Sequence, residues 1–206
     1  MHSYTDSIKI AGIEILSDLG KFTATSYWED GPSGYLINRA KRVGLEVSVD
    51  QWGNVLAVKP GSDPNAEGIA FVAHMDHPGY EVVAQKGDQL VLKTLGGIGI
   101  AAGRDGAKIL VIDSSGRRID ATVVGAEKAE GNFQRSRESA GWLGTDTVYA
   151  QLSKDHDLGV LPVPAVPSLP DFIIDNDLVR MRAADDLAGC AAILAALEAI
   201  IESPIR

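Results

Sequence analysis

The sequence is poor in cysteine and in long apolar runs, and it lacks a signal pattern at its start. Each of these shortages excludes a class of protein. It contains a single cysteine, Cys190, which excludes an internal disulfide framework and is typical of a reducing compartment. Its longest uninterrupted apolar run, from Leu187 to Leu197, has 11 residues, too few to span a bilayer. The first residues, MHSYTDSIKI, lack the basic-then-apolar pattern of a secretory signal. We therefore expect a cytoplasmic protein without a membrane span.

Positive charge is also scarce. The chain has 19 Lys and Arg residues against 28 Asp and Glu residues, which gives a net charge of −9. Because an acidic chain binds polyanions poorly, we expect neither nucleic acid nor an anionic membrane as a partner. Hydrophobic residues, in contrast, make up 45% of the 206 residues, which is enough for a sizeable core in one or two domains.

The first part of the chain has helical and then strand-like periodicity. Apolar residues at helical spacing predict one helix over residues 8–19 and a second from Ser33 to Val43. Alternation then predicts a hairpin whose strands, 45–49 and 55–58, are joined by a turn at Asp50–Asn54.

A continuous apolar run, Gly68–Ala73, follows the predicted hairpin. Such a run is typical of a strand that is buried on both faces of a sheet. It ends at His74, Asp76 and His77, and open α/β sheets place their chemistry at the carboxyl ends of such strands.

Short β-rich pieces separated by glycine turns follow from Tyr80 to Leu152, which predicts a small all-β domain. The proline-rich stretch Leu161–Pro170 is interpreted as an extended linker, and the apolar residues after Asp186 predict a buried helix. The fold class expected is therefore α/β, a three-layer α/β/α domain with an inserted β-barrel-like domain. The predicted boundaries are 1–82 and 172–206 for the α/β domain and 83–171 for the insertion.

His74 and Asp76 are the first candidates for chemistry. A histidine that binds a metal usually gives its other ring proton to a carboxylate, and an H-x-D sequence supplies both the histidine and the carboxylate. The alternative is a surface histidine beside a solvated aspartate, since short motifs match freely.

Asp185 and Asp186, in the sequence DDLAG, are the second candidates. Two carboxylates before an apolar helix are also typical of plain N-capping, because Asp there complements the helix dipole. The functional interpretation is that carboxylate oxygens join an imidazole nitrogen in binding divalent ions.

The order D-x-x-G-N (Asp50–Asn54), H-x-D (His74–Asp76) and D-D-x-x-G (Asp185–Gly189) resembles the co-catalytic di-zinc aminopeptidase superfamily. The spacing of 111 positions from His74 to Asp185 resembles that of the glutamyl-aminopeptidase and tetrahedral-aminopeptidase family, which carries a β domain between these two ligands. The resemblance covers essentially the whole chain.

This resemblance implies a role for each candidate. His74 would be a terminal ligand of one metal ion and Asp185 would bridge two, which would be zinc or cobalt. Asp76 would orient His74, Asp186 would support the bridging residue, and the Asp185–Asp186 peptide bond would be cis. Two residues depart from the family pattern: His77 stands where a glutamate is usual, and Leu187 where an arginine is usual. We interpret His77 as a satisfied surface histidine rather than a ligand.

The activity implied is that of a metallo-aminopeptidase, a hydrolase that removes N-terminal residues from peptides with water activated by two metal ions. The family takes its general base from a Glu-Glu pair after the paired aspartates, and no such pair follows Asp185 here. The glutamates that follow Asp185 are Glu198 and Glu202, and both are interpreted as helix-surface charges. We therefore expect the chain to be an incomplete and inactive N-terminal portion of a longer peptidase.

Two other functions stay open. A related metallohydrolase, such as a carboxypeptidase or a deacylase, could share these ligands. A non-catalytic module that self-associates through the β insertion would need no metal. A homo-oligomer is expected for the peptidase as well as for the non-catalytic module. The residues that bind the substrate remain unknown.

Overall fold

The computed structural model describes residues 4–63, 65–127 and 141–201, and they form two compact units. The first unit consists of residues 1–22, 29–76 and 170–206, and the second of residues 23–28 and 77–169. No helix in the described part of the chain is both long enough and apolar enough to cross a membrane.

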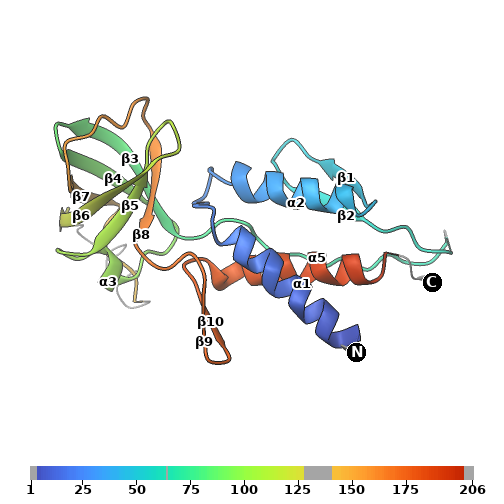
Figure 1. Cartoon of the computed structure of the whole chain (residues 1–206). Coiled ribbons are helices and arrows are strands. Elements are labelled where there is room, and N and C mark those ends of the chain that lie inside the picture. The colour runs from blue at the N-terminus through green and yellow to red at the C-terminus, as the bar shows by residue number, and fades with distance from the viewer. Residues whose placement is uncertain (1–3, 64, 128–140, 202–206) are drawn as a thin grey trace. The chain divides into compact units, whose positions relative to one another are not determined.

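Three helices and a hairpin make up most of the first unit (Figure 1). The helices are α1 (Tyr4–Leu19), α2 (Asp30–Arg42) and α5 (Ala184–Ala199), as the periodicity predicts. The hairpin joins β1 (Glu46–Val49) to β2 (Val55–Val58) in an antiparallel pair. A second small hairpin joins β9 (Ile173–Asp175) to β10 (Leu178–Arg180).

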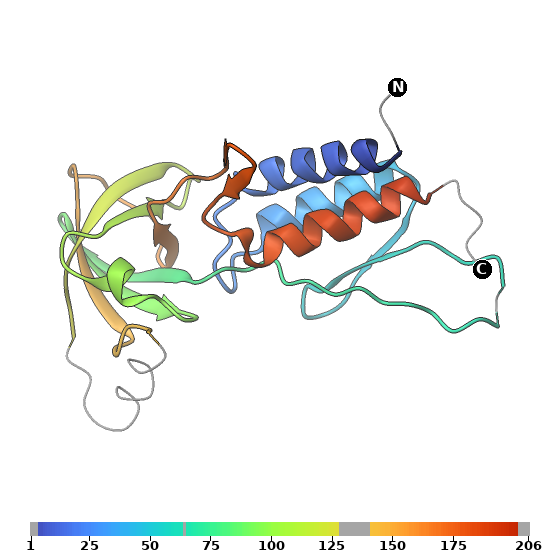
Figure 2. The ribbon, with the colours of Figure 1, turned by 90° about the horizontal axis from the view of Figure 1, so that it is seen from below.

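The core of the first unit lies among its helices, which run close together in Figure 2. Ile15 and Leu19 of α1 and Leu187 of α5 are fully buried there. Val47 and Ala57 of the hairpin pack against this core, so one side of the hairpin is covered. Residues at the spacing of one helix turn thus meet in the core, as amphipathic helices require.

The turn at Asp50–Asn54 is confirmed. The Asp50 carboxylate accepts hydrogen bonds from the backbone amides of Trp52 and Asn54, at 2.8 and 2.9 Å, and from the Asn54 side chain at 2.8 Å. Gly53 has a φ of +88°, in the region that favours glycine. The D-x-x-G-N motif is therefore a self-bonded turn.

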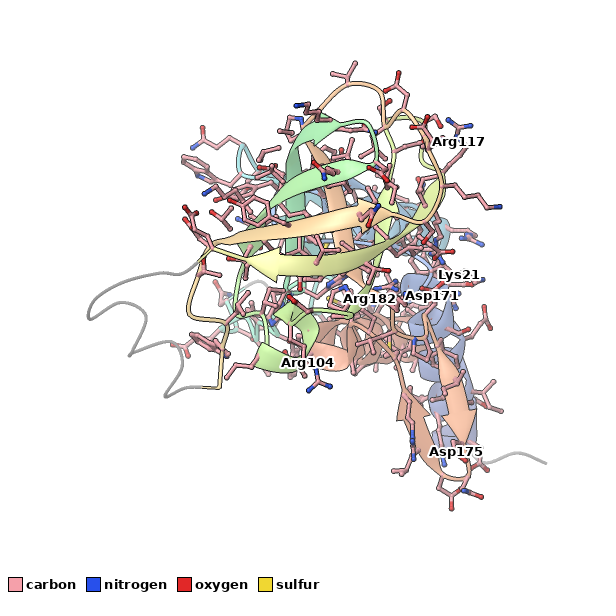
Figure 3. The ribbon with its side chains drawn as sticks, turned by 90° about the vertical axis from the view of Figure 1, so that its left-hand side faces the viewer. Lys21, Arg104, Arg117, Asp171, Asp175 and Arg182 are labelled. Atoms are coloured by element: carbon pink, nitrogen blue, oxygen red, sulfur yellow. The ribbon has the colours of Figure 1, made fainter. Side chains whose placement is uncertain are left out.

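An ion pair fixes the chain around the end of α1. The buried Arg182 guanidinium pairs with Asp171 at 2.8 Å (Figure 3). It also donates to the backbone carbonyls of Gly20 and Phe22, each at 3.3 Å. Helix carboxyl ends leave carbonyls without partners inside the helix. Arg182 donates to two carbonyls just beyond the carboxyl end of α1. Its pair with Asp171 joins this part of the chain to residues 170–182.

The second unit is a closed six-stranded barrel with the strand order β3-β4-β7-β6-β5-β8. Along each strand the side chains point alternately into and out of the barrel. Those that point inward form one apolar core that includes Tyr80, Val82, Leu92 and Val111. A four-residue helix, α3 (Ile100–Gly103), follows β4. The barrel strands are β3 (Gly79–Lys86), β4 (Gln89–Leu95), β5 (Lys108–Ile112), β6 (Arg118–Ala126), β7 (Thr147–Leu152) and β8 (Val163–Pro167).

The prediction of a linker at Leu161–Pro170 is wrong. Residues 163–167 form β8, which pairs with both β3 and β5 and closes the barrel. Proline lacks an amide hydrogen and is rare in paired strands, so the composition pointed away from a strand. Val163, Ala165 and Val166 nevertheless bury their side chains, and this burial outweighs the local signal.

The prediction of a buried strand at Gly68–Ala73 is also wrong. Within the described residues this segment belongs to no strand, and Ile69, Phe71 and Val72 are 75–90% exposed. A strand needs neighbouring strands to pair with its backbone, and none of the described strands lies in a ladder with this segment.

Candidate metal-binding site

His74 and Asp185 lie together in the first unit, although they are 111 positions apart in the sequence. The His74 Nε2 atom is 3.2 Å from the Asp185 Oδ1 atom. His74 follows the extended segment 68–73, whereas Asp185 lies at the start of α5. Both side chains are open to solvent, and Asp185 is almost fully exposed.

Asp76 contacts the other side of the His74 ring. The His74 Nδ1 atom is 3.0 Å from the Asp76 backbone carbonyl oxygen and 3.4 Å from its Oδ1 atom. A carbonyl can only accept, so Nδ1 carries the proton in this contact and Nε2 is left to face Asp185. Backbone and side chain of Asp76 thus lie where an orienting group for His74 is expected.

The charge around His74 raises its pKa above the usual value. Partial burial by itself lowers this pKa, but the hydrogen bond to the Asp76 carbonyl and the carboxylates of Asp76 and Asp185 outweigh that effect. An imidazole lone pair and a carboxylate oxygen repel each other at 3.2 Å unless a proton or another cation lies between them. The pair therefore favours a proton or a metal ion between these two atoms.

The spacing of these two atoms fits a divalent metal ion. Two ligands of a tetrahedral zinc ion, each about 2.0–2.1 Å from it, lie about 3.3 Å apart. The observed 3.2 Å between His74 Nε2 and Asp185 Oδ1 agrees with this value. Among the residues that the structure describes, however, no group of three or more His, Cys, Asp or Glu side chains could hold a metal ion. His74 and Asp185 thus fit part of a site.

Asp186 has a different environment from Asp185. Its Oδ1 atom accepts a hydrogen bond from the backbone amide of Gly189, at 3.1 Å, in the manner of a helix cap. The peptide bond between Asp185 and Asp186 is cis, as expected, and both residues have non-helical backbone angles. Of the two carboxylates, that of Asp186 accepts a hydrogen bond within the helix, whereas that of Asp185 faces His74.

Gly189 and Cys190 complete this end of α5, and the sequence motif included only Gly189. A Cβ atom at Gly189 would collide with the Asp186 carboxylate, which explains why glycine closes the D-D-x-x-G motif. Cys190 is a core residue, and its thiol donates to the His74 backbone carbonyl at 3.4 Å. Burial, with a smaller effect of Asp186, raises the pKa of this thiol to about 11, so it is not a thiolate at neutral pH.

His77 belongs to the second unit. It is buried rather than on the surface, which corrects the expectation. The Ala24 amide donates to its Nε2 atom at 3.2 Å, and its Nδ1 atom lies 3.1 Å from the Pro78 carbonyl oxygen. Both ring nitrogens are satisfied, so His77 has the contacts of a structural residue.

Glu198 is not a free surface charge either. Its two carboxylate oxygens accept hydrogen bonds from Arg39 Nε and Nη2 at 2.6 and 3.1 Å, and both side chains are mostly buried. Glu198 therefore joins α5 to α2. Glu202 lies outside the described residues.

Comparison with known proteins decides the family. The model of the M42 glutamyl aminopeptidase family matches residues 53–206. The chain belongs to this family. The match includes His74, Asp76, Asp185 and Asp186, and it confirms the resemblance in the motif order. No curated protein matches the sequence.

Solved structures share the fold. A TET aminopeptidase from a marine sediment thaumarchaeote has a TM-score of 0.72 at 20% identity, over 96% of this chain and 56% of its own. The TET1 peptidase of Pyrococcus horikoshii, which can assemble into a tetrahedron or a large octahedral shell, has a TM-score of 0.69 at 21% identity, over 94% of this chain and 57% of its own. A Thermotoga maritima protein named as an endoglucanase has a TM-score of 0.65 at 17% identity, over 92% of this chain and 54% of its own.

Two facts follow from these matches. The chain has a mixed α/β fold of the kind found in TET peptidases. It also spans little more than half the length of these solved relatives. Because the identities are low and the relatives are named as peptidases and as an endoglucanase, the fold alone does not decide the reaction.

Proposed function

We propose that this chain is the N-terminal portion of a metal-dependent aminopeptidase. The observation that carries the proposal is the approach of His74 Nε2 to Asp185 Oδ1 within 3.2 Å, in a chain of the M42 glutamyl aminopeptidase family. His74 would bind one of two divalent ions, zinc or cobalt, and Asp185 would bridge both. The remaining ligands and the general base would come from residues beyond Arg206. The 206 residues alone would then be inactive.

The residues of this chain would act by positioning. The Asp76 carbonyl accepts the Nδ1 proton of His74 and so keeps the Nε2 atom directed to Asp185. Asp186 caps α5 through Gly189, which fixes the backbone that carries Asp185. When bound, the metal ions would supply Lewis acidity toward the scissile carbonyl and lower the pKa of the attacking water.

The architecture proposed is a three-layer α/β/α domain with the barrel as an insertion in it. The barrel strands stand between the sequence positions of His74 and Asp185, which supports an insertion. We also propose a cytoplasmic location, supported by the single cysteine, and a homo-oligomer that associates through the barrel. The assembly of the TET1 peptidase into closed shells supports self-association here.

The test uses the longer protein. Its release of N-terminal residues from peptides should require zinc or cobalt and should fall by about 100-fold or more in Asp185→Asn, since a bridging ligand is lost. Asp177→Asn, an exposed aspartate in the β9–β10 turn, is the matched control and should keep the activity. Full activity of Asp185→Asn would contradict the metal role.

Two alternative functions give different results in the same assay. A carboxypeptidase or a deacylase would act on N-blocked peptides, whereas an aminopeptidase needs a free amine. A non-catalytic module would bind no metal and would cleave neither substrate.

A further inference from the structure

Cys190 joins the two elements that carry the candidate metal ligands. It lies on α5, in the first turn after Asp186, and its thiol donates to the backbone carbonyl of His74 at 3.4 Å. The His74 Nε2 atom lies 3.2 Å from Asp185 Oδ1, which is also on α5. The helix therefore contacts His74 twice, at the ring and at the backbone, and two contacts fix an orientation that one contact leaves free to turn.

The backbone of His74 lies against the core, whereas its ring does not. Ala73 and Met75, on either side of it, pack against the core of the first unit, to which Cys190 belongs. Alternate residues of an extended chain point to opposite sides, and the His74 side chain is half exposed. Amides inside a helix are used by the helix itself, so a carbonyl that lies against α5 needs a donor from a side chain. The Cys190 thiol supplies that donor.

The turn of α5 that carries Cys190 is itself fixed. The Asp186 carboxylate accepts a hydrogen bond from the Gly189 amide at 3.1 Å, and the Cys190 side chain is buried. Asp185 and Cys190 thus belong to one capped end of the helix. A shift of the His74 backbone away from Cys190 is therefore also a shift of His74 relative to Asp185.

We propose that Cys190 is a positioning residue for His74: its thiol holds the His74 carbonyl against α5 and so keeps the ring at the distance from Asp185 that one metal ion requires. This inference rests on the proposed function, because it takes His74 and Asp185 as metal ligands. Removing a group that orients a ligand weakens metal binding by about 10- to 100-fold. A thiol is a weak donor, so we expect about 10-fold.

Two other roles fit Cys190 less well. A metal ligand would direct its sulfur to the metal, but the Sγ atom contacts the His74 carbonyl, and no group of three or more metal-binding side chains forms among the described residues. A plain core cysteine behaves as a small apolar residue and needs no directed hydrogen bond. The bond to a ligand's own backbone distinguishes Cys190 from such a residue.

Cobalt binding by the full-length gene product tests the proposal. The affinity is measured by competition with a chelator, and the melting temperature of the metal-free protein is measured beside it. Cys190→Ala removes the donor and should weaken cobalt binding by about 10-fold. Cys190→Ser, whose hydroxyl donates in place of the thiol, should restore most of that affinity even if it melts earlier.

Leu194→Ala is the matched control on the same helix. Leu194 is buried in the same core, and its side chain makes no hydrogen bond. The larger loss of buried volume should lower the melting temperature more than Cys190→Ala does. The cobalt affinity of Leu194→Ala should nevertheless equal that of the unmodified protein, which a merely structural role of Cys190 would not explain.

Three results would overturn the proposal. They are an unchanged cobalt affinity in Cys190→Ala, an equal loss of affinity in Leu194→Ala, and an equal loss in Cys190→Ser, which a thiolate-to-cobalt absorption band in the unmodified protein would trace to direct ligation by sulfur.

Release of N-terminal residues from peptides is measured on the same samples, so that the two proposals can fail separately. A protein that releases nothing, yet loses cobalt affinity in Cys190→Ala, would contradict the proposed function and support the positioning role. An active protein whose cobalt affinity does not depend on Cys190 would do the opposite. A protein that binds no cobalt at all would contradict both.

Discussion

The glycine at position 189 shows how closely one residue depends on another. A glycine inside a helix normally costs about 1 kcal/mol relative to alanine, so Gly→Ala usually stabilises. At Gly189 the Asp186 carboxylate occupies the space that a Cβ atom would need. At Gly12 in α1 the nearest atom to such a Cβ is that of Ala195, at an ordinary 3.8 Å.

These two glycines should therefore respond with opposite signs. We expect Gly189→Ala to lower the free energy of unfolding by about 1–3 kcal/mol, because Asp186 must leave the cap. Gly12→Ala should raise it by about 0.5–1 kcal/mol. Urea unfolding followed by circular dichroism measures both, and stabilisation by Gly189→Ala would show that the Asp186 cap is dispensable.

Asp113 is the most heavily hydrogen-bonded carboxylate described in the barrel. It accepts from the Ser115 hydroxyl and amide, from the amide and Nε of Arg117, and from His156 Nε2 at 2.9 Å. The bond from the Ser115 hydroxyl, followed by those from His156, Arg117 and the backbone, holds the pKa of Asp113 well below its usual value despite the cost of burial.

The lowered pKa makes the barrel sensitive to acid. The pKa of an unfolded Asp is about 3.9. A carboxyl whose pKa is lower in the folded state stabilises the fold at any pH above that value, and this stability is lost as the pH falls from there toward the folded-state pKa. Asp113→Asn should lower the melting temperature at pH 7 and reduce the further loss on acidification. Asp120→Asn, an exposed aspartate on β6 with no side-chain hydrogen bond among the described residues, is the control. Equal melting curves for the two variants would contradict this role.

At the scale of elements, α2 and α5 are joined by the mostly buried Arg39–Glu198 pair. Removing one partner leaves the other charge without its hydrogen bonds, so Arg39→Ala should cost about 2 kcal/mol of unfolding free energy. Lys21→Ala breaks the exposed pair with Asp18 and should cost less than about 0.5 kcal/mol. Chemical denaturation compares them, and equal costs would mean that burial adds nothing to the Arg39 pair.

Elements whose signal is local could be predicted from the sequence. The helices α1, α2 and α5 follow from apolar spacing, and the β1–β2 hairpin from alternation around a self-bonded turn. The approach of His74 to Asp185 followed from the motif order. The contact between Cys190 and His74 could not be predicted, because nothing local marks a thiol that donates to a distant carbonyl.

Elements that depend on distant partners could not be predicted. Residues 163–167 form a strand because β3 and β5 lie on either side of them, although their prolines argue against it. Residues 68–73 have every local feature of a strand, and no described strand pairs with them. In both cases the pairing partner, rather than the propensity of the segment, decides the outcome.

At the scale of the whole molecule, the two units differ in how many neighbouring strands pair with the backbone hydrogen-bonding groups of each strand. Every strand of the closed barrel has two neighbours, whereas β1 and β2 have only each other among the described strands. We expect the amides of inward-facing barrel residues such as Val82, Leu92 and Val111 to exchange most slowly, and those of Glu46–Val49 about 100-fold or more faster. Peptide-level hydrogen exchange measures this, and uniform rates would contradict a barrel that is the more stable unit.

The closure of the barrel by β3 and β8 bears on how such a chain could arise. Tyr80 pairs with Ala165, so the polypeptide enters the barrel and leaves it at neighbouring positions. A chain that lacked everything in between would need to bridge only the width of one antiparallel pair, about 5 Å. The two ends of the barrel segment 79–167 are therefore adjacent, which is the geometry that tolerates circular permutation or the grafting of another module with adjacent ends.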